Sequence, residues 1–315
     1  MHKSRNGAVS GKLKRHANGG REERRHTEGK RTKDRRDQTD NQSPRPSANE
    51  AAEQAAAALE NTDMIICGVS SFGVDWFAEN VLPLLPEESV TALVVTREFH
   101  ENEYLMMVTR KGTVKRIPFI ALKTNRKGGI RAITLNEGDH LINVIRTEGD
   151  DNILLATAQG MAICFNENDV RPMGRDAAGV RGILLTGDDF VVGAEKAEEG
   201  KTLLTVTVNG FGKRTELTEY LRTGPNGEKI AQGRGGKGLK NYNITPKTGP
   251  VAGCRVVGED DDVMLIENGG VIIRVPASDI NIYKRDVQGV IVMRIEPGNQ
   301  LVAIERIAKV EEPQK

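Results

Sequence analysis

The sequence predicts an all-β fold built from repeated, propeller-like blades, and three observations carry this prediction. A phrase of two strand-like runs around a glycine occurs four times, and each copy is followed by a basic phrase that closes on a second glycine. The glycines are Gly112, Gly160, Gly210 and Gly270 in the first series and Gly129, Gly179, Gly238 and Gly289 in the second. Their intervals of 48 to 60 residues are typical of a multi-stranded blade. No helical periodicity separates them, so we expect about four recognisable blades plus part of a fifth.

The first phrase of each unit is expected to form a β-hairpin. Its four copies cover residues 104–118, 153–165, 203–215 and 263–276. The glycine at each centre supplies the positive φ that a tight hairpin turn requires. Acidic clusters at 148–151 and 258–262 precede two of the hairpins. Because they lack the ligand spacing of a calcium loop, we interpret them as solvated turn tips and predict no metal site.

The N-terminal part of the chain differs from the rest in charge and composition. Residues 1–47 hold 14 Lys+Arg against 6 Asp+Glu, whereas residues 48–315 hold 31 against 38. The first segment has too few apolar residues to offset its ordering entropy and is expected to be disordered. It is either a nonspecific binder of nucleic-acid phosphates or a solvated tail without a role. Residues 48–60 are strong helix formers but too short for more than a marginal helix.

The repeat breaks near residue 80. Residues 84–96 resemble the closing segments 135–145 and 295–304 of later units, but residues 61–79 contain neither phrase. We therefore expect a disordered, low-complexity segment at 1–79 that is not native to the repeat, an incomplete blade array at 80–308 and a tail at 309–315. A frameshift or a misassigned start would produce such a junction. Residues 80–95 would then form an orphan strand with an aggregation-prone edge.

The composition limits the class of protein. A charged fraction of 28% with 37% hydrophobic residues is typical of a soluble protein, and only 4% aromatic residues means that Val, Ile and Leu must form the core. Cys67, Cys164 and Cys254 lie far apart and are interpreted as small apolar side chains in a reducing compartment. The chain lacks an apolar run of about 20 residues and a signal peptide, so we expect a cytoplasmic protein without a membrane segment.

The second phrase suggests a binding surface for a polyanion. It combines Arg and Lys with glycines, which let the backbone approach a phosphate closely while an amide and a neighbouring cation donate to it. Radial repetition would place these loops at matching positions on the rim of the fold. The alternative is that the glycines serve only the turns and the cations only solvate them.

Three stretches of residues show a resemblance to a known family. Residues 169–175, 212–215 and 232–238, in this order, make the chain similar to the C-terminal domain of the DNA gyrase A protein, and the resemblance covers about residues 80–308. It implies a β-pinwheel that binds duplex DNA nonspecifically and bends or wraps it. The family's wrapping motif, the gyrase A box, has Arg where this chain has Gly233, so the stretch here resembles a degenerate internal copy. Its residues are Gln232, Gly233, Arg234, Gly235, Gly236, Lys237 and Gly238.

The resemblance also implies partners and candidate contacts. The partners are duplex DNA and the gyrase catalytic core, formed by the B subunit with the N-terminal region of the gyrase A protein, in the cytoplasm at the nucleoid. The cleaving tyrosine of the family lies in a region that this chain lacks, so no catalysis by the chain alone and no cofactor are expected. The candidate DNA-binding residues are Lys111, Lys115, Arg116, Arg126, Lys127, Arg131, Arg175, Arg181, Lys213, Arg214, Arg234, Lys237, Lys240 and Arg285.

Three other interpretations stay open at this point. Residues 233–238 fit the glycine pattern of dinucleotide-binding folds, but they lack the preceding strand and following helix that this pattern needs. A bladed scaffold for protein partners is favoured modestly by the acidic balance of residues 48–315. The corresponding tail of topoisomerase IV is the third, although that tail usually has fewer and more divergent blades.

Overall fold

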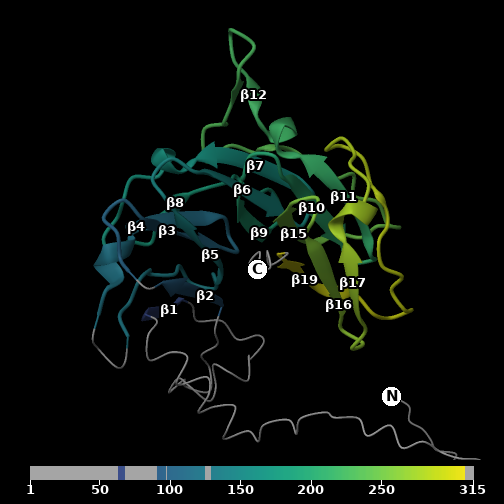
Figure 1. Ribbon diagram of the computed structural model, residues 1–315, viewed down its shortest axis with the longest axis horizontal. Helices are drawn as coiled ribbons and strands as arrows, with labels where there is room; N and C mark the ends of the chain where they lie inside the picture. Colours follow the sequence, from purple (N-terminus) through teal and green to yellow (C-terminus); the bar gives the residue numbers. More distant parts are fainter. Residues whose placement is uncertain (1–62, 68–90, 97, 125–128, 309–315) are drawn as a thin grey trace, which may run out of the picture. The chain divides into compact units, whose positions relative to one another are not determined.

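The fold of this chain is built from β-strands, as the ribbon diagram of the computed structural model shows (Figure 1). The structure describes residues 63–67, 91–96, 98–124 and 129–308. Within these ranges there is no α-helix, and the only helical elements are short 3-10 turns. The predicted marginal helix at 48–60 and the tail at 309–315 lie outside the described residues.

Four antiparallel sheets follow the four repeat units, and the predicted all-β bladed fold is confirmed. In the first sheet the strand order is β5 (Leu141–Thr147), β3 (Tyr104–Thr109), β4 (Thr113–Pro118) and β8 (Val180–Arg181). In the second it is β9 (Val191–Lys196), β6 (Asn152–Thr157), β7 (Met161–Asn166) and β14 (Leu239–Lys240). In the third it is β15 (Val251–Val257), β10 (Thr202–Thr207), β11 (Phe211–Glu216) and β18 (Val290–Ile291).

The fourth sheet has only three strands. Its order is β19 (Leu301–Ile307), β16 (Asp262–Glu267) and β17 (Ile272–Pro276). Two further pairs of strands form two-stranded sheets: β1 (Asp63–Cys67) with β2 (Ala92–Thr96), and β12 (Arg222–Thr223) with β13 (Lys229–Ile230). Thus β1 lies inside the segment 1–79 that we expected to be disordered. Its apolar Met-Ile-Ile-Cys run gives β2 one antiparallel partner, so β2 is not a wholly orphaned strand.

Each predicted hairpin forms around its glycine. The φ angles of Gly112, Gly160, Gly210 and Gly270 are 78°, 78°, 76° and 91°, in the left-handed region that favours glycine. The strands on either side pair in register, as β3 does with β4 from Tyr104↔Pro118 to Val108↔Val114. A short 3-10 turn follows each hairpin, from η1 (Phe119–Leu122) to η4 (Ala277–Asp279).

The fourth strand of each complete sheet comes from the next repeat unit. β8, β14 and β18 are the segments that directly follow Gly179, Gly238 and Gly289, and each pairs with the second hairpin strand of the preceding unit. The repeat pattern predicted that these residues lie in rim loops. The exchange was not expected, because two-residue strands give no periodic signal of their own.

Apolar side chains form separate buried clusters between successive sheets. One cluster combines Met106 and Val114 of the first sheet with Ile153 and Ile163 of the second. Another combines Leu204 and Val206 of the third sheet with Val263 and Leu265 of the fourth. The inner strands β5, β9, β15 and β19 contact one another in this order.

The core residues are mainly Val, Ile and Leu, as the scarcity of aromatic residues predicted. Cys164 and Cys254 are free, buried side chains within a cluster between the second and third sheets. Burial raises the pKa of each thiol to about 12. Both thiols are therefore protonated and unreactive at neutral pH, consistent with the apolar role predicted for them.

Candidate nucleic-acid interface

Exposed cations stand at a constant position in three of the four repeat units. Two residues after the glycine of the second phrase stand Arg131, Arg181, Lys240 and Ile291, and the three cations are exposed. Arg181 lies on β8 and Lys240 on β14, the outermost strands of the first and second sheets. The first and second sheets therefore present a cation at equivalent places on their outer strands.

Glycine is required where the exchanged strand begins. Gly238 has a φ of 72°, and a Cβ added there would lie 2.2 Å from the carbonyl oxygen of Ala162 on the neighbouring strand. A Cβ on Gly179 would lie 2.6 Å from the carbonyl oxygen of Val114. Any side chain would push the outer strand away from its sheet, so these glycines set the position of the cations that follow.

A second set of arginines connects neighbouring loops. Four residues before the glycine stand Arg175, Arg234 and Arg285. The Nη1 atom of Arg234 donates to the carbonyl oxygen of Arg181 at 3.1 Å, and Nη1 of Arg285 donates to that of Lys240 at 3.0 Å. Arg234 and Arg285 therefore rest on the outer strand of the preceding sheet and bring their charge close to the exposed cation there.

Two of the candidate cations line one cavity. A cavity of about 510 Å³ lies at the first sheet, and its wall includes Lys111, Thr113, Asn136 and Arg181. The Nζ atom of Lys111 donates to the carbonyl oxygen of Glu137 at 2.7 Å, which holds the lysine at this wall. The hairpin turn and the exchanged strand of the next unit thus place two positive side chains around the same opening.

Two lysines of the candidate set are buried and bind protein carbonyls instead of solvent. Lys115 donates to the carbonyl oxygens of Arg175 and Ala177 at 2.7 and 2.8 Å. Lys213 donates to those of Lys284 and Arg285, both at 2.9 Å. Burial lowers the pKa of both lysines, and that of Lys213 falls to about 7. These lysines hold the backbone of the basic loops in place.

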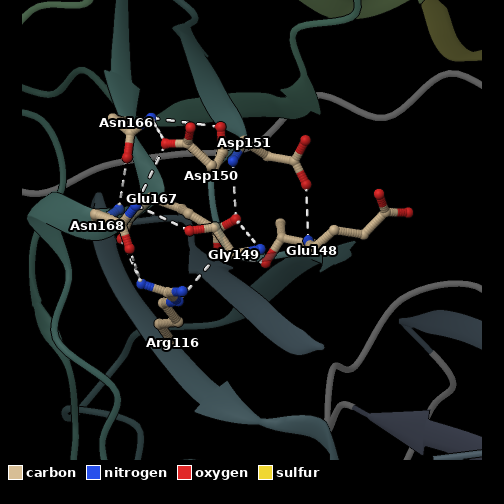
Figure 2. Close-up of polar contacts among 9 residues, drawn as sticks. Arg116, Glu148, Gly149, Asp150, Asp151, Asn166, Glu167 and Asn168 are labelled. Atoms are coloured by element: carbon tan, nitrogen blue, oxygen red, sulfur yellow. Dashed lines mark hydrogen bonds and ion pairs between the residues drawn. The ribbon is translucent and has the colours of Figure 1, made fainter. Parts of the chain in front are cut away.

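Two arginines of the candidate set are also buried. Arg116 is 3% exposed, and its Nε atom lies 2.9 Å from Glu167 Oε2 while Nη1 donates to Asn168 Oδ1 at 2.8 Å. Figure 2 shows Glu167 between this guanidinium and the acidic turn, where it accepts from the amides of Gly149 and Asp151. Arg214 likewise donates to the Ile280 carbonyl and pairs with Glu259 at 2.6 Å.

The acidic turn at 148–151 is therefore more than a solvated tip. The buried carboxylate of Glu167 organises its backbone, and Asp150 accepts from Asn166 at 3.1 Å on its exposed side (Figure 2). Among the residues that the structure describes, no group of three or more His, Cys, Asp or Glu is placed to hold a metal ion. Within the same described ranges, no helix has the length and apolar character to cross a membrane.

Residues 232–238 pack against the second sheet and the preceding loop. Gln232 donates from its backbone amide to the Cys164 carbonyl at 2.7 Å, and Gly235 donates to that of Gly182 at 2.6 Å. Lys237 is exposed, and Gly238 precedes the outer strand. Residues 232–238 therefore fix the loop through their amides and present a lysine to solvent.

Not all candidate cations can be placed, and others were missed. Arg126 and Lys127 lie outside the described residues. Arg175 is exposed in the loop before β8, while Arg171, Lys284 and Arg294 are exposed cations of the same loops that sequence analysis did not include. They occupy no constant position in the repeat, so the pattern gave no signal for them.

Comparisons with known proteins agree with this architecture. The family model described as DNA gyrase C-terminal domain, beta-propeller matches residues 103–148, 151–198, 201–232, 228–257 and 261–308. The chain is 38% identical over 230 residues to the DNA gyrase A protein of Klebsiella oxytoca and 43% identical over 230 residues to that of Clostridium acetobutylicum. Each alignment covers 73% of this chain but only 25% and 27%, respectively, of the relative, so the match spans about a quarter of those proteins.

Solved structures show the same fold. The C-terminal domain of DNA topoisomerase IV aligns with a TM-score of 0.68 at 22% identity and covers 78% of this chain and 79% of that one. A DNA gyrase A C-terminal domain aligns with a TM-score of 0.66 at 22% identity and covers 79% and 83%. The two solved structures match this fold with nearly equal TM-scores. Both sequence relatives named above are gyrase A proteins. The chain belongs to the DNA gyrase C-terminal domain, beta-propeller family.

Proposed function

We propose that this chain binds duplex DNA without base specificity and bends it along the outer strands of its sheets, as the C-terminal part of a gyrase A protein. The observation that supports this most directly is the constant position of the exposed cations Arg131, Arg181 and Lys240 in the repeat. A row of cations with a structural period suits a ligand whose negative charges also repeat, and the duplex backbone is such a ligand.

The proposed interface consists of the candidate cations whose side chains are not buried. Lys115, Arg116, Lys213 and Arg214 are buried and already bound to protein oxygens, so we leave them out. The exposed side chains of Lys111, Arg175, Lys237 and Lys240 stay in, with Arg131 and Arg181. Arg234 and Arg285 are half-buried and contribute charge while they brace the loops.

The cost of bending predicts how binding depends on salt and on the DNA sequence. Smooth bending of a short duplex costs a few kcal/mol, which many phosphate contacts must offset. We therefore expect strong salt dependence and little sequence preference. Cleavage and ATP-driven supercoiling would need the B subunit together with the N-terminal region of the gyrase A protein, in the cytoplasm at the nucleoid.

The test is a salt titration of DNA binding with a matched pair of double variants. Arg181→Gln/Lys240→Gln removes two exposed outer-strand cations, and Arg222→Gln/Lys229→Gln removes two cations of the β12–β13 hairpin as a control. We expect the first variant to lower the slope of log K against log salt by about 2, at roughly 0.9 per phosphate contact. The control should leave the slope unchanged.

Bending that winds the duplex about an axis is measured separately from binding, because it changes the linking number whereas a planar bend does not. A nicked circular plasmid sealed by ligase in the presence of the chain should show a shifted linking number, and the outer-strand variant should reduce the shift more than the control. Absent or salt-insensitive binding by the unaltered chain would contradict the proposal and favour a protein-interaction scaffold.

A further inference from the structure

Three sheets of this fold are completed by the same kind of donor segment. In each, the residue after the donor glycine pairs with the residue two positions after the hairpin glycine: Val180 with Val114, Leu239 with Ala162 and Val290 with Gly212. In each, the carbonyl of the hairpin glycine also accepts from the donor. Gly112, Gly160 and Gly210 accept from the amides of Gly182, Asn241 and Val292 at 2.8, 2.7 and 2.9 Å.

The fourth sheet has the acceptor strand but no donor. Ile272 stands two positions after Gly270 and is 58% exposed, whereas Val114 and Ala162 at the equivalent positions are fully buried. Its neighbour Val271 is 40% exposed. Within the described part of the chain, β17 pairs only with β16, and no amide donates to the Gly270 carbonyl. The outer edge of β17 therefore presents apolar side chains and free backbone groups together.

The first unit has the opposite deficit. Gly129 has a φ of 67° and begins a segment with the same pattern as the three donors. A Cβ on Gly179, Gly238 or Gly289 would lie 2.2 to 2.6 Å from a carbonyl oxygen of its acceptor strand, but a Cβ on Gly129 would meet nothing within 4 Å. Ile130 and Ile133 rest against the core of their own sheet. Among the described residues this donor has no acceptor.

We propose that β17 accepts the segment 129–133 of a second copy of this chain, so that copies associate head to tail. The pairing follows the register of the three complete sheets: Ile272 would face Ile130, Val271 would face Arg131, and the amide of Ala132 would donate to the Gly270 carbonyl. One contact between two copies would give β17 an outer strand and give segment 129–133 an acceptor strand, because each copy carries one unpaired donor and one unpaired acceptor among its described residues. Such a heterologous contact adds an edge strand and leaves a further donor and acceptor free at the ends.

The first test is sedimentation velocity of the full chain over a concentration series. Ile272→Lys blocks the acceptor, and Gly129→Val blocks the donor because a β-branched residue disfavours its positive φ. Val302→Lys is the matched control, since Val302 is 56% exposed on β19 rather than on β17. We expect concentration-dependent association of the unaltered chain, at least tenfold weaker association of each blocked variant, and no change in the control.

Mixing distinguishes a head-to-tail contact from other modes of association. The Ile272→Lys chain keeps its donor and the Gly129→Val chain keeps its acceptor, so an equimolar mixture should form a heterodimer and nothing larger. Restoration of the full series of larger species, or no restoration, would contradict the proposal. An unaltered chain that stays monomeric at all concentrations would also overturn it.

A cross-linking measurement covers the case in which a blocked variant does not fold. Ile130→Cys and Ile272→Cys are single, mild changes in different molecules, and facing residues of paired antiparallel strands are close enough for a disulfide. Oxidation of the mixture should give a cross-linked dimer that contains one chain of each kind. Cross-linking equal to that of an Ile130→Cys and Val302→Cys mixture would count against the proposed register.

Discussion

The Nζ atom of Lys213 lies 2.9 Å from the carbonyl oxygen of Arg285, 72 positions further along the chain. The same amine donates to the Lys284 carbonyl and to the Thr215 hydroxyl, each at 2.9 Å. Lys115 forms the equivalent contacts in the first sheet, to the carbonyls of Arg175 and Ala177. The basic residues of the repeat therefore include buried lysines that hold a loop as well as exposed cations that the loop carries.

Loss of the buried lysine should destabilise the third sheet and its loop. We expect Lys213→Ile to lower the free energy of unfolding by about 2–6 kcal/mol, because two partly buried carbonyls lose their donor at about 1–3 kcal/mol each. An isoleucine fits the position in principle, since Ile163 occupies it in the second sheet. Urea denaturation gives the stability, and hydrogen exchange should show faster exchange at residues 284–289.

The control for this loss is Lys284→Ile, in the same loop. Lys284 is exposed, so its replacement should change the free energy of unfolding by less than about 0.5 kcal/mol. Equal stability of the two variants would show that the carbonyl contacts of Lys213 are not important for the fold.

The same lysine predicts a pH dependence of stability. Burial lowers the pKa of Lys213 from 10.5 to about 7, while the nearby charges of Asp286 and Glu219 oppose this shift. The unfolded chain then binds one more proton than the folded chain between about pH 7 and 10.5. The contribution of Lys213 to stability should therefore rise with pH across this window, by at most about 1.4 kcal/mol per pH unit.

The measurement is a set of urea denaturation curves between about pH 7.5 and 9.5, inside the window in which the two states differ in bound protons. The Lys213→Ile variant should lose this rising contribution, so the difference in stability between the unaltered chain and the variant should grow with pH. The Thr215 hydroxyl can accept from the ammonium or donate to the neutral amine, so both protonation states keep three partners. A difference that is constant with pH, or that shrinks as pH rises, would contradict the lowered pKa.

Alanine substitutions at two glycines distinguish the cost of backbone strain from the cost of close packing. Gly200 and Gly238 have similar φ angles, 78° and 72°, but a Cβ would meet nothing within 4 Å at Gly200 and would lie 2.2 Å from the Ala162 carbonyl at Gly238. Alanine at either site should cost about 1–2 kcal/mol for the left-handed conformation. Alanine at Gly238 should cost about 1–3 kcal/mol more, because the β14 strand must move away from β7.

Thermal unfolding of the two alanine variants measures this difference directly. The Gly238→Ala variant should also weaken DNA binding, since Lys240 lies two residues further on the displaced strand. Equal stability of the two variants would show that the outer strand can shift at no cost.

The bladed fold and its hairpins could be predicted from the sequence because both have a period. The glycine turns recur at a constant place, and a turn glycine is a local signal that needs no knowledge of the rest of the fold. The exchange of outer strands could not be predicted in this way. It depends on contact between segments far apart in the chain, such as Val114 with Val180, and two residues carry no recognisable strand pattern.

Only part of the candidate interface could be predicted, because position in the repeat does not show which cations are buried. Position in the repeat identified Arg181 and Lys240, which the structure exposes, but it also selected Lys115 and Lys213, which the structure buries. A strand pattern gives alternation but not the identity of the neighbouring sheet, and it is the following loop that covers Lys213. Cation type alone cannot tell a side chain that binds carbonyls from one that faces solvent.

The buried pair of Arg116 and Glu167 should be far more sensitive to change than its counterpart in the third sheet. The Glu167 carboxylate is fully buried and accepts from Gly149, Asp151 and the Thr147 hydroxyl in addition to its ion pair. Glu167→Gln leaves the Arg116 guanidinium without its counter-charge and brings an amide NH₂ towards groups that also donate. We expect a loss of about 3–5 kcal/mol in the free energy of unfolding.

Glu259→Gln is the matched control, because Glu259 pairs with Arg214 from a side chain that is 67% exposed. Solvent can replace that contact, so the change in stability should be small. Urea denaturation of both variants tests the contrast, and hydrogen exchange at 148–151 should rise only in Glu167→Gln. If both variants lost the same stability, the acidic turn at 148–151 would not depend on its buried carboxylate, and the structural role assigned to Arg116 would have to be given up.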